Sequence, residues 1–302
     1  MNSNQDNHRL KIQANRETET LHCFNHYAMA TEYGIFIRQQ DKKYAEQAAF
    51  AAFMLLDKLE SDLSRFNENS EITRINNLGP GRSLFVGFDT MACLQTALEI
   101  RNITGGAFDP GAGNLITAFK TPGQSIGDKS HHGSLMGINL DPANNLVQKN
   151  DSGVNIDLGA IAKGYVLDRM AELLFEWSLD DFLIHSGYST VITAQGSAGK
   201  LSWKVSISDP DQNLVWKVIE MRNDVLSASG LKKGAHIIDP RSGECISGNR
   251  SSWVTAENAA RADALSTAFI VLSVGEIKQI CLNLPAVKAC LLMDGKFINF
   301  GL

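Results

Sequence analysis

Two glycines in an otherwise apolar, helix-forming stretch limit how the middle of this chain can fold. The stretch reads "NIDLGAIAKGYVLD" from Asn155 to Asp168, and it also carries Asp157 and Lys163. A glycine in a helix interior costs roughly 1 kcal/mol relative to alanine, and a lone buried Asp–Lys pair is a poor source of stability. We therefore expect this stretch to bring bare backbone close to another group, with charge nearby.

The composition is that of an ordinary globular protein. The chain has 302 residues, of which 44% are hydrophobic and 20% are charged, and these values are typical of a folded domain. The length permits one large domain or two smaller ones. The formal net charge of −5 does not favour nucleic acid or an anionic membrane as the main partner.

The cysteines and the N-terminal segment bear on the compartment. Five cysteines without a CxxC pair fit reduced thiols better than a disulfide framework. The first twenty residues are polar and lack the apolar core of a signal peptide. No run of about 18 uncharged apolar residues is present, so no transmembrane helix is expected. These features predict a cytoplasmic protein.

Hydrophobic periodicity predicts a mixture of helices and strands. Apolar residues recur at helical spacing in four segments, at about 41–64, 89–103, 160–177 and 257–274. Short runs of β-branched and aromatic residues predict strands at 33–40, 181–187, 190–196, 203–208, 215–221, 225–229, 286–294 and 296–300. The segment 120–153 is rich in turn-forming residues and predicts loop with short strands. We expect a tail over residues 1–24 and a single α+β domain over residues 25–302.

Three stretches besides the opening one combine chemically useful residue types. "ARADALSTAF" places Asp263, Ser266 and Thr267 at positions i, i+3 and i+4, so one helix face presents a carboxylate and two hydroxyls. Such oxygen ligands suit Mg²⁺, although the hydroxyls can instead bond back to a backbone carbonyl. "TGGAFDPGAG" and "HIIDPRSG" each favour a simple turn when taken alone. The opening stretch could add a backbone carbonyl ligand.

Familiar nucleotide and metal motifs are not matched. "GSAGKLS" lacks the spacing of a P-loop, and "GAGNL" lacks the rest of a dinucleotide-binding fingerprint. The pair His131-His132 lies in a predicted loop, where a surface pair is favoured over a metal site.

Taken together and in this order, the stretches resemble the ApbE family, the FAD:protein FMN transferases. The resemblance runs from about residue 25 to the C-terminus. The matching stretches are "MAT" (29–31), "LSRFNENSEITRIN" (63–76), "GGAFDP" (105–110), "DLGAIAKGYVLD" (157–168), "HIIDPRSG" (236–243) and "ADALST" (262–267). Each motif is modest alone, but the ordered set is highly specific.

The resemblance implies a T-fold-like α+β domain, with mixed sheets and packed helices, that binds FAD as substrate in a cleft and uses Mg²⁺. The implied reaction moves FMN from FAD to a Thr or Ser hydroxyl of a target flavoprotein, with release of AMP. Two alternatives stay open. One is a pyrophosphatase that cleaves FAD to FMN and AMP, and the other is a non-catalytic flavin-binding relative.

The resemblance also implies roles for individual residues. The implied metal ligands are Ala160, through its carbonyl, Asp263, Ser266 and Thr267. Catalysis is implied for Asp263 and His236. Contacts with FAD are implied for Met29, Phe66, Ala107, Phe108, Asp109, Asp157, Lys163, His236 and Ile238. Three positions depart from the family pattern: Tyr188 and Ser189 stand where many members have Gly and Asp, and Ala30 replaces a Gly.

Overall fold

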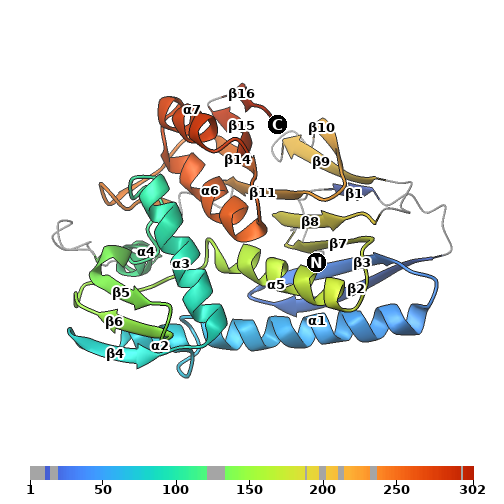
Figure 1. The fold of residues 1–302 in the computed structure, drawn as a ribbon. Coiled ribbons are helices and arrows are strands. Elements are labelled where there is room, and N and C mark those ends of the chain that lie inside the picture. Colours follow the sequence, from blue (N-terminus) through green and yellow to red (C-terminus); the bar gives the residue numbers. More distant parts are fainter. Residues whose placement is uncertain are drawn as a thin grey trace, which may run out of the picture.

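An eight-stranded antiparallel sheet forms the centre of the molecule (Figure 1). The computed structural model describes residues 11–13, 20–120, 133–187, 189–196, 202–209, 214–231, 237–293 and 295–302. The strand order is β16-β15-β14-β11-β8-β7-β3-β2. In chain order these strands are β2 (Leu21–Ala28), β3 (Thr31–Arg38), β7 (Phe182–Ser186), β8 (Thr190–Ala194), β11 (Val225–Gly230), β14 (Arg250–Thr255), β15 (Lys288–Met293) and β16 (Lys296–Phe300).

Alternation along the strands supplies both faces of this sheet with apolar side chains. In β3, Tyr33, Ile35 and Ile37 are fully buried in the larger core, which they share with the helices. Phe36 lies between them in the sequence and packs against a second core that contains Trp203. Successive side chains of a strand point to opposite faces, so the sheet is covered on both sides.

Four long helices cover the face with the larger core. They are α1 (Lys42–Leu63), α3 (Phe88–Ile103), α5 (Ala162–Glu176) and α6 (Ala259–Val271). Helix α1 starts where the Asp41 side chain accepts the Tyr44 N–H, an N-cap that satisfies one of the unpaired donors of the first turn. The α1 residues Ala45, Ala48 and Ala52 are fully buried, and their small side chains permit close packing.

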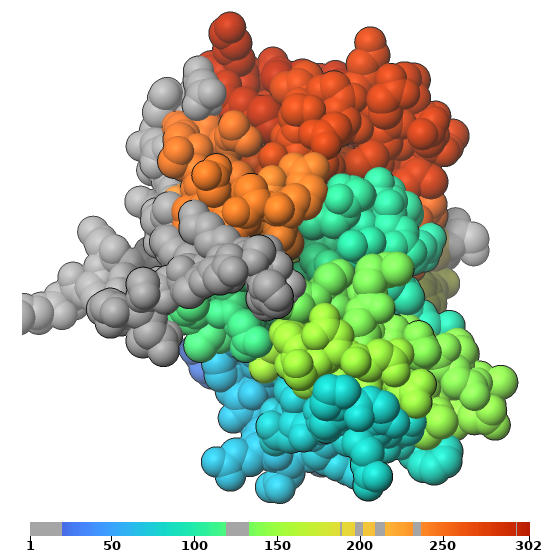
Figure 2. All heavy atoms as spheres, turned by 90° about the vertical axis from the view of Figure 1, so that its left-hand side faces the viewer, coloured from blue at the N-terminus to red at the C-terminus, as the bar shows by residue number. Residues whose placement is uncertain are grey.

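Smaller elements surround this core. On the second face lies a sheet of β1 (Lys11–Gln13), β9 (Trp203–Asp209) and β10 (Leu214–Met221). A separate sheet contains β4 (Arg82–Phe85), β6 (Leu146–Lys149) and β5 (Ile138–Asp141). The remaining elements are α2 (Glu71–Asn76), α4 (Gly113–Lys120), the 3-10 turn Leu135–Gly137, the hairpin β12 (Ile238–Asp239) with β13 (Glu244–Cys245), and α7 (Val274–Asn283). Figure 2 shows C-terminal segments, in red and orange, above the segments of the β4–β6–β5 sheet, in cyan to yellow-green.

The predicted α+β class is confirmed, and the four predicted helices are present with ends shifted by up to three residues. Three short helices, α2, α4 and α7, were not predicted, because six to ten residues give too few turns for a clear helical period. The structure also describes β1 and the start of β2 at Leu21 within the segment expected to be a tail. None of the helices in the described part of the chain is long and apolar enough to span a bilayer.

Candidate functional site

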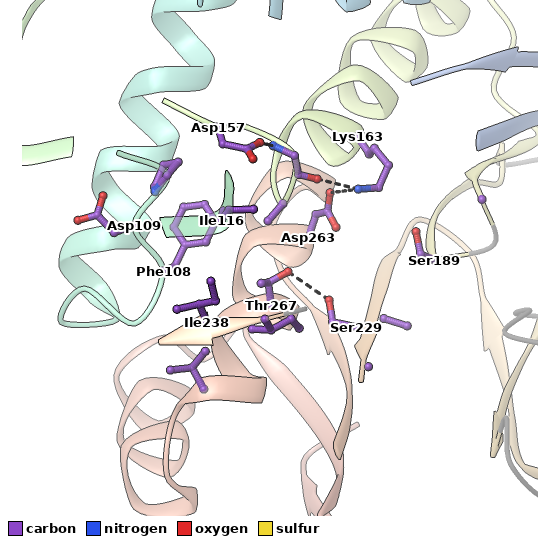
Figure 3. Close-up of a pocket in the computed structure, with 18 of the residues that line it drawn as sticks. Phe108, Asp109, Ile116, Asp157, Lys163, Ser189, Ser229, Ile238, Asp263 and Thr267 are labelled. Atoms are coloured by element: carbon purple, nitrogen blue, oxygen red, sulfur yellow. Dashed lines mark hydrogen bonds and ion pairs between the residues drawn. The ribbon is translucent and has the colours of Figure 1, made fainter. Parts of the chain in front are cut away.

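A half-open cavity of about 550 Å³ lies between α6, the ends of the central strands and the loops that follow α3 and β6. Its walls come from segments far apart in the sequence, and Figure 3 shows ten of these residues with labels. One side is polar and contains Asp157, Lys163, Asp263 and Thr267, whereas the opposite side is apolar. A cavity of this size with a few converging polar groups is typical of a small-molecule site.

Asp263 is the most deeply buried charged group of this cavity, with 3% of its surface exposed. Its Oδ2 accepts the Gly164 N–H at 3.1 Å, and the Lys163 Nζ lies 4.0 Å from the same oxygen. The Ser227 hydroxyl donates to Oδ1 at 3.4 Å. Burial raises the pKa of Asp263, and Lys163 and these hydrogen bonds only partly oppose that effect. The protonated form of Asp263 is therefore favoured more strongly than that of an exposed carboxyl group.

Gly164 explains how Asp263 and Lys163 meet. A Cβ atom at position 164 would lie 2.1 Å from the Ala259 carbonyl oxygen, so only glycine permits this approach of α5 to α6. One turn further along α5, the Asp168 carboxylate accepts the N–H groups of Ala259 and Ala260 at 2.7 and 2.8 Å. This contact caps the N-terminus of α6 and fixes the two helices together.

Glycine is favoured at position 159 for a different reason, which is the hydrogen bonding of its backbone. Its N–H donates to Asp157 Oδ1 at 2.9 Å, and its carbonyl oxygen accepts from Lys163 Nζ at 2.8 Å. Asp157 Oδ2 forms an ion pair with Arg65 Nε at 3.1 Å. A Cβ atom at position 159 would lie only 3.0 Å from Asp157 Oδ1. The Gly159 backbone thus connects Asp157 with Lys163, and Arg65 pairs with Asp157 from outside the residues that line the cavity.

The hydroxyl groups of α6 point in two directions. Thr267 lines the cavity, and its Oγ1 lies 3.2 Å from Ser229 Oγ at the end of β11. Ser266 is fully buried and does not line the cavity. Its hydroxyl donates to the Asp263 carbonyl at 2.8 Å, the local bond that the sequence left open as an alternative to metal binding. The Ser266 hydroxyl also lies 2.8 Å from Ser229 Oγ, so its contact with the cavity runs through Ser229, which lines it.

The apolar side is formed by Phe108, Ile116 and Ile238 (Figure 3). The turn that carries Phe108 is held from within. The Thr104 hydroxyl accepts the Phe108 N–H at 3.2 Å, and the Asp109 carboxylate accepts the N–H groups of Gly111 and Leu135 at 2.9 and 2.8 Å. Asp109 lines the cavity, but its oxygens already hold the turn.

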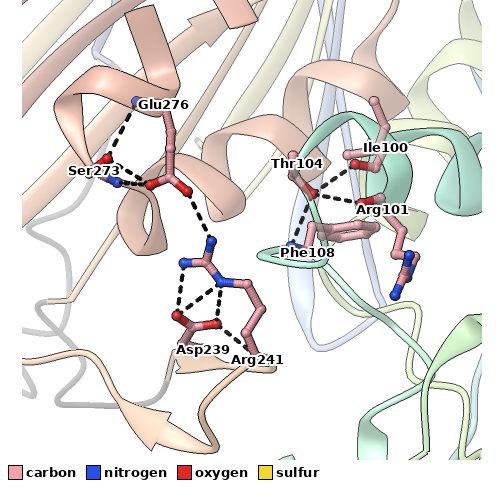
Figure 4. A network of polar contacts seen from close by, with 8 residues as sticks. All are labelled: Ile100, Arg101, Thr104, Phe108, Asp239, Arg241, Ser273 and Glu276. Atoms are coloured by element: carbon pink, nitrogen blue, oxygen red, sulfur yellow. Dashed lines mark hydrogen bonds and ion pairs between the residues drawn. The ribbon is translucent and has the colours of Figure 1, made fainter. Parts of the chain in front are cut away.

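A surface ion-pair network fixes the hairpin that carries Ile238 (Figure 4). Arg241 donates to both oxygens of Asp239, in the same hairpin, and to Glu276 Oε1 of α7 at 3.0 Å. Glu276 in turn accepts from the Ser273 N–H and hydroxyl in a capping box. The network ties this side of the cavity to α7.

The structure brings most of the predicted residues together around one cavity. Those that line it are Met29, Phe66, Ala107, Phe108, Asp109, Asp157, Ala160, Lys163, Ile238, Asp263 and Thr267. Ser266 is the exception among the described residues. His236, Tyr188 and the pair His131-His132 lie outside the residues that the structure describes.

Sequence reasoning missed Arg65, Ser229 and Trp253. Ser229 and Trp253 line the cavity, and Arg65 pairs with Asp157 behind it. Arg65 lies inside the quoted stretch "LSRFNENSEITRIN". The Asp157 carboxylate was expected at the site without a basic partner, and this gap could have pointed to Arg65. Trp253 comes from a strand without a chemical motif, and nothing in its local sequence indicates a cavity.

The fold and the cavity together define a class: an α+β protein whose cavity, with one polar and one apolar side, suits a small-molecule ligand. The ApbE family profile matches residues 29–291, and the chain belongs to this family. A FAD:protein FMN transferase of Vibrio cholerae is 25% identical over 266 residues, covering 81% of this chain and 79% of the relative. One of Haemophilus influenzae is 26% identical over 269 residues, covering 80% and 75%.

A solved structure is similar over almost the whole chain. The ApbE protein of Thermotoga maritima has a TM-score of 0.82 at 25% identity, covering 93% of this chain and 97% of that chain. The relatives are transferases, and this chain is accordingly placed among the transferases.

Proposed function

We propose that this chain is a Mg²⁺-dependent FAD:protein FMN transferase. The relatives of the same family carry that name. The observation that carries the proposal is the buried Asp263 carboxylate, which faces the cavity beside Lys163 and Thr267. Burial of an anion without full compensation is unfavourable and is expected where a site must bind a cation.

The donor set fits Mg²⁺. Asp263 offers a carboxylate, Thr267 a hydroxyl and Ala160 a backbone carbonyl, and all three residues line the cavity. Mg²⁺ prefers oxygen ligands and is commonly held by one or two carboxylates together with substrate phosphates. In the described part of the chain no group of three or more His, Cys, Asp or Glu gathers as a metal cluster, so the proposed site depends on the phosphates of its substrate. When bound, the ion would neutralise charge on the pyrophosphate.

The proposed reaction balances without a further reactant. A hydroxyl oxygen of the acceptor protein forms a bond to the flavin-side phosphorus of FAD, and the P–O bond to the bridging oxygen breaks. AMP leaves with that oxygen, and the hydroxyl proton is released. Lys163 would place positive charge beside the phosphates, and the wall of Phe108, Ile116 and Ile238 would hold apolar parts of FAD. Positioning and charge neutralisation are the main sources of rate in such transfers.

Product analysis tests the proposal. FAD, Mg²⁺ and a pool of synthetic threonine-containing peptides are incubated with the protein, and the products are separated by mass. We expect FMN covalently bound to peptide, together with AMP. Free FMN and AMP without labelled peptide would indicate a pyrophosphatase instead, and unchanged FAD would indicate a non-catalytic relative.

A further inference from the structure

A second cavity of about 320 Å³ adjoins the proposed FAD site. It lies among the turn after α1, the end of α2, helix α4 and the strand-like segment at Asn155. The eight residues that line it are Arg65, Phe66, Thr73, Asn76, Asn77, Asn114, Thr117 and Asn155. Nothing in the proposed handling of FAD uses the amide groups that dominate this lining.

The two cavities share a boundary. Phe66 lines both of them. Arg65 lines the second cavity, whereas its ion-pair partner Asp157 lines the first. The Arg65 guanidinium also donates to Thr117 Oγ1 at 3.0 Å. A ligand in the second cavity would therefore lie directly beside the polar end of the first.

The chemistry of the second cavity does not suit an anion. Arg65 is the one charged residue among the eight that line it, and its charge is already paired with Asp157 at 3.1 Å. Four asparagines, two threonines and Phe66 remain. Such a lining favours an uncharged ligand with many hydrogen-bond donors and acceptors, and a polypeptide backbone is such a ligand.

One asparagine already shows this kind of pairing. The Asn76 amide donates to the Ile156 carbonyl at 3.0 Å and accepts the Ile156 N–H at 2.6 Å, so it pairs with both backbone polar groups of one residue. Asn77 and Asn155 lie next to this pair in the lining. Within the described part of the chain, neither of these two side-chain amides forms a hydrogen bond, and both are available to a ligand.

Phe66 adds an apolar contact at the boundary. Its surface is 81% exposed, yet its turn is ordered, because the Phe66 N–H donates to Ser64 Oγ at 3.3 Å and the Thr73 hydroxyl donates to the Arg65 carbonyl at 3.1 Å. An aromatic side chain exposed on a preformed turn is a frequent anchor for a protein partner.

We propose that the second cavity binds the acceptor polypeptide as an extended segment. The backbone of the acceptor pairs with the Asn77 and Asn155 amides, and the residue that bears the hydroxyl passes Phe66 toward Lys163 and Asp263. This proposal rests on the proposed transferase function and adds where its second substrate binds.

Variants of the two asparagines test the assignment. Asn77 follows the last residue of α2 and is exposed, so Asn77→Ala should fold normally. The probe is the one threonine-containing peptide that wild type labels fastest from a pool with randomised flanks. Loss of one hydrogen bond should raise the KM for this peptide about two- to tenfold in Asn77→Ala and in Asn155→Ala. The Kd for FAD should stay unchanged. Asn283→Ala, at the exposed end of α7 and outside both cavities, serves as the matched control.

The outcomes separate the two proposals. If wild type labels no peptide, the transferase proposal fails and this one falls with it. If wild type labels the peptide but both asparagine variants keep its KM, only the second cavity is wrongly assigned. A rise in the Kd for FAD equal to the rise in the peptide KM would show that the cavity belongs to the FAD site, and this too would overturn the proposal.

Discussion

At the scale of single residues, we expect Asp263 to be required for turnover but not for the stability of the fold. Burial raises the pKa of its carboxyl, so the ionised form that binds a cation is disfavoured by the surrounding protein. We expect Asp263→Asn to lose about 100-fold or more of Mg²⁺-dependent turnover. Its free energy of unfolding should be unchanged or higher, because a neutral amide removes the buried charge. Turnover measured against Mg²⁺ concentration, together with urea unfolding, checks both parts.

The control for Asp263→Asn is Asp181→Asn. Asp181 pairs with Arg38 at 3.0 Å, outside the residues that line either cavity. The turnover of the Asp181→Asn variant should match that of wild type. Full turnover of Asp263→Asn at low Mg²⁺ would contradict the metal assignment.

Residue spacing predicted that Asp263, Ser266 and Thr267 lie close together on α6, but it did not predict which of the two hydroxyl residues lines the cavity. At about 100° per residue, Ser266 and Thr267 lie on opposite sides of Asp263 around the α6 axis. Spacing alone cannot say which of them faces the cavity, because that depends on how α6 is rotated against the sheet. The structure turns Thr267 outward and Ser266 inward. The roles of the lining residues in binding FAD and Mg²⁺ stay predictions.

At the scale of elements, the contact between α5 and α6 sets the geometry of the site. A Cβ atom at position 164 would lie 2.1 Å from backbone, so Gly164→Ala must push the helices apart. Overpacking of this kind destabilises by about 1–3 kcal/mol, and the separation of Lys163 and Asp263 should increase. We expect a lower free energy of unfolding in urea and a higher Kd for FAD.

Gly275→Ala is the matched control for that substitution. Position 275 lies in α7, and the nearest atom to an added Cβ is Ser273 Oγ at 4.0 Å. Alanine should therefore raise stability there by several tenths of a kcal/mol, because it favours the helix. If both glycine substitutions stabilised the protein, close packing of α5 on α6 would not be the reason for Gly164.

The hairpin β12–β13 depends on Arg241 for its position against α7. Arg241→Ala removes both connections, and the Ile238 side of the cavity should loosen. We expect the Kd for FAD to rise several-fold, with little change in the free energy of unfolding because surface ion pairs contribute little. Flavin fluorescence gives the Kd. Arg222→Ala, an exposed change outside both cavities, should leave it unchanged, and equal Kd values in all three proteins would contradict this role for the hairpin.

At the scale of the whole molecule, the class and the long helices could be predicted from the sequence, whereas the arrangement of the sheet could not. Strand β8 pairs with β7, its neighbour in the chain, but also with β11, more than thirty residues later. Hydrophobic alternation specifies which face of a strand is buried, not which strand lies beside it. Strands β7 and β8 are buried on both faces, so even their alternation is absent.

The dependence of global stability on pH gives a test at this scale. Asp168 in α5 accepts two N–H groups from the start of α6, and burial raises the pKa of its carboxyl to about 7 from a usual 3.8. Between about pH 4 and 7 the folded state therefore binds more protons than the unfolded state. By linkage, the contribution of Asp168 to stability falls as pH rises through this window and is constant above it.

Asp168→Asn removes this titration. The free energy of unfolding of wild type, minus that of the variant, should fall between pH 5 and 7, by at most about 1.4 kcal/mol per pH unit, and then level off. Any weakening of the cap of α6 shifts this difference equally at every pH, so the slope is the quantity to read.

Ser70→Ala is the control, because Ser70 caps α2 through the Thr73 N–H without titrating. Loss of this N-cap hydrogen bond in Ser70→Ala should lower the free energy of unfolding by about 1 kcal/mol at all pH values. Urea unfolding at each pH supplies both differences. Parallel curves for wild type and Asp168→Asn would mean that the cap between α5 and α6 is already ionised at pH 5, and a difference that grows with pH would reverse the assigned sign.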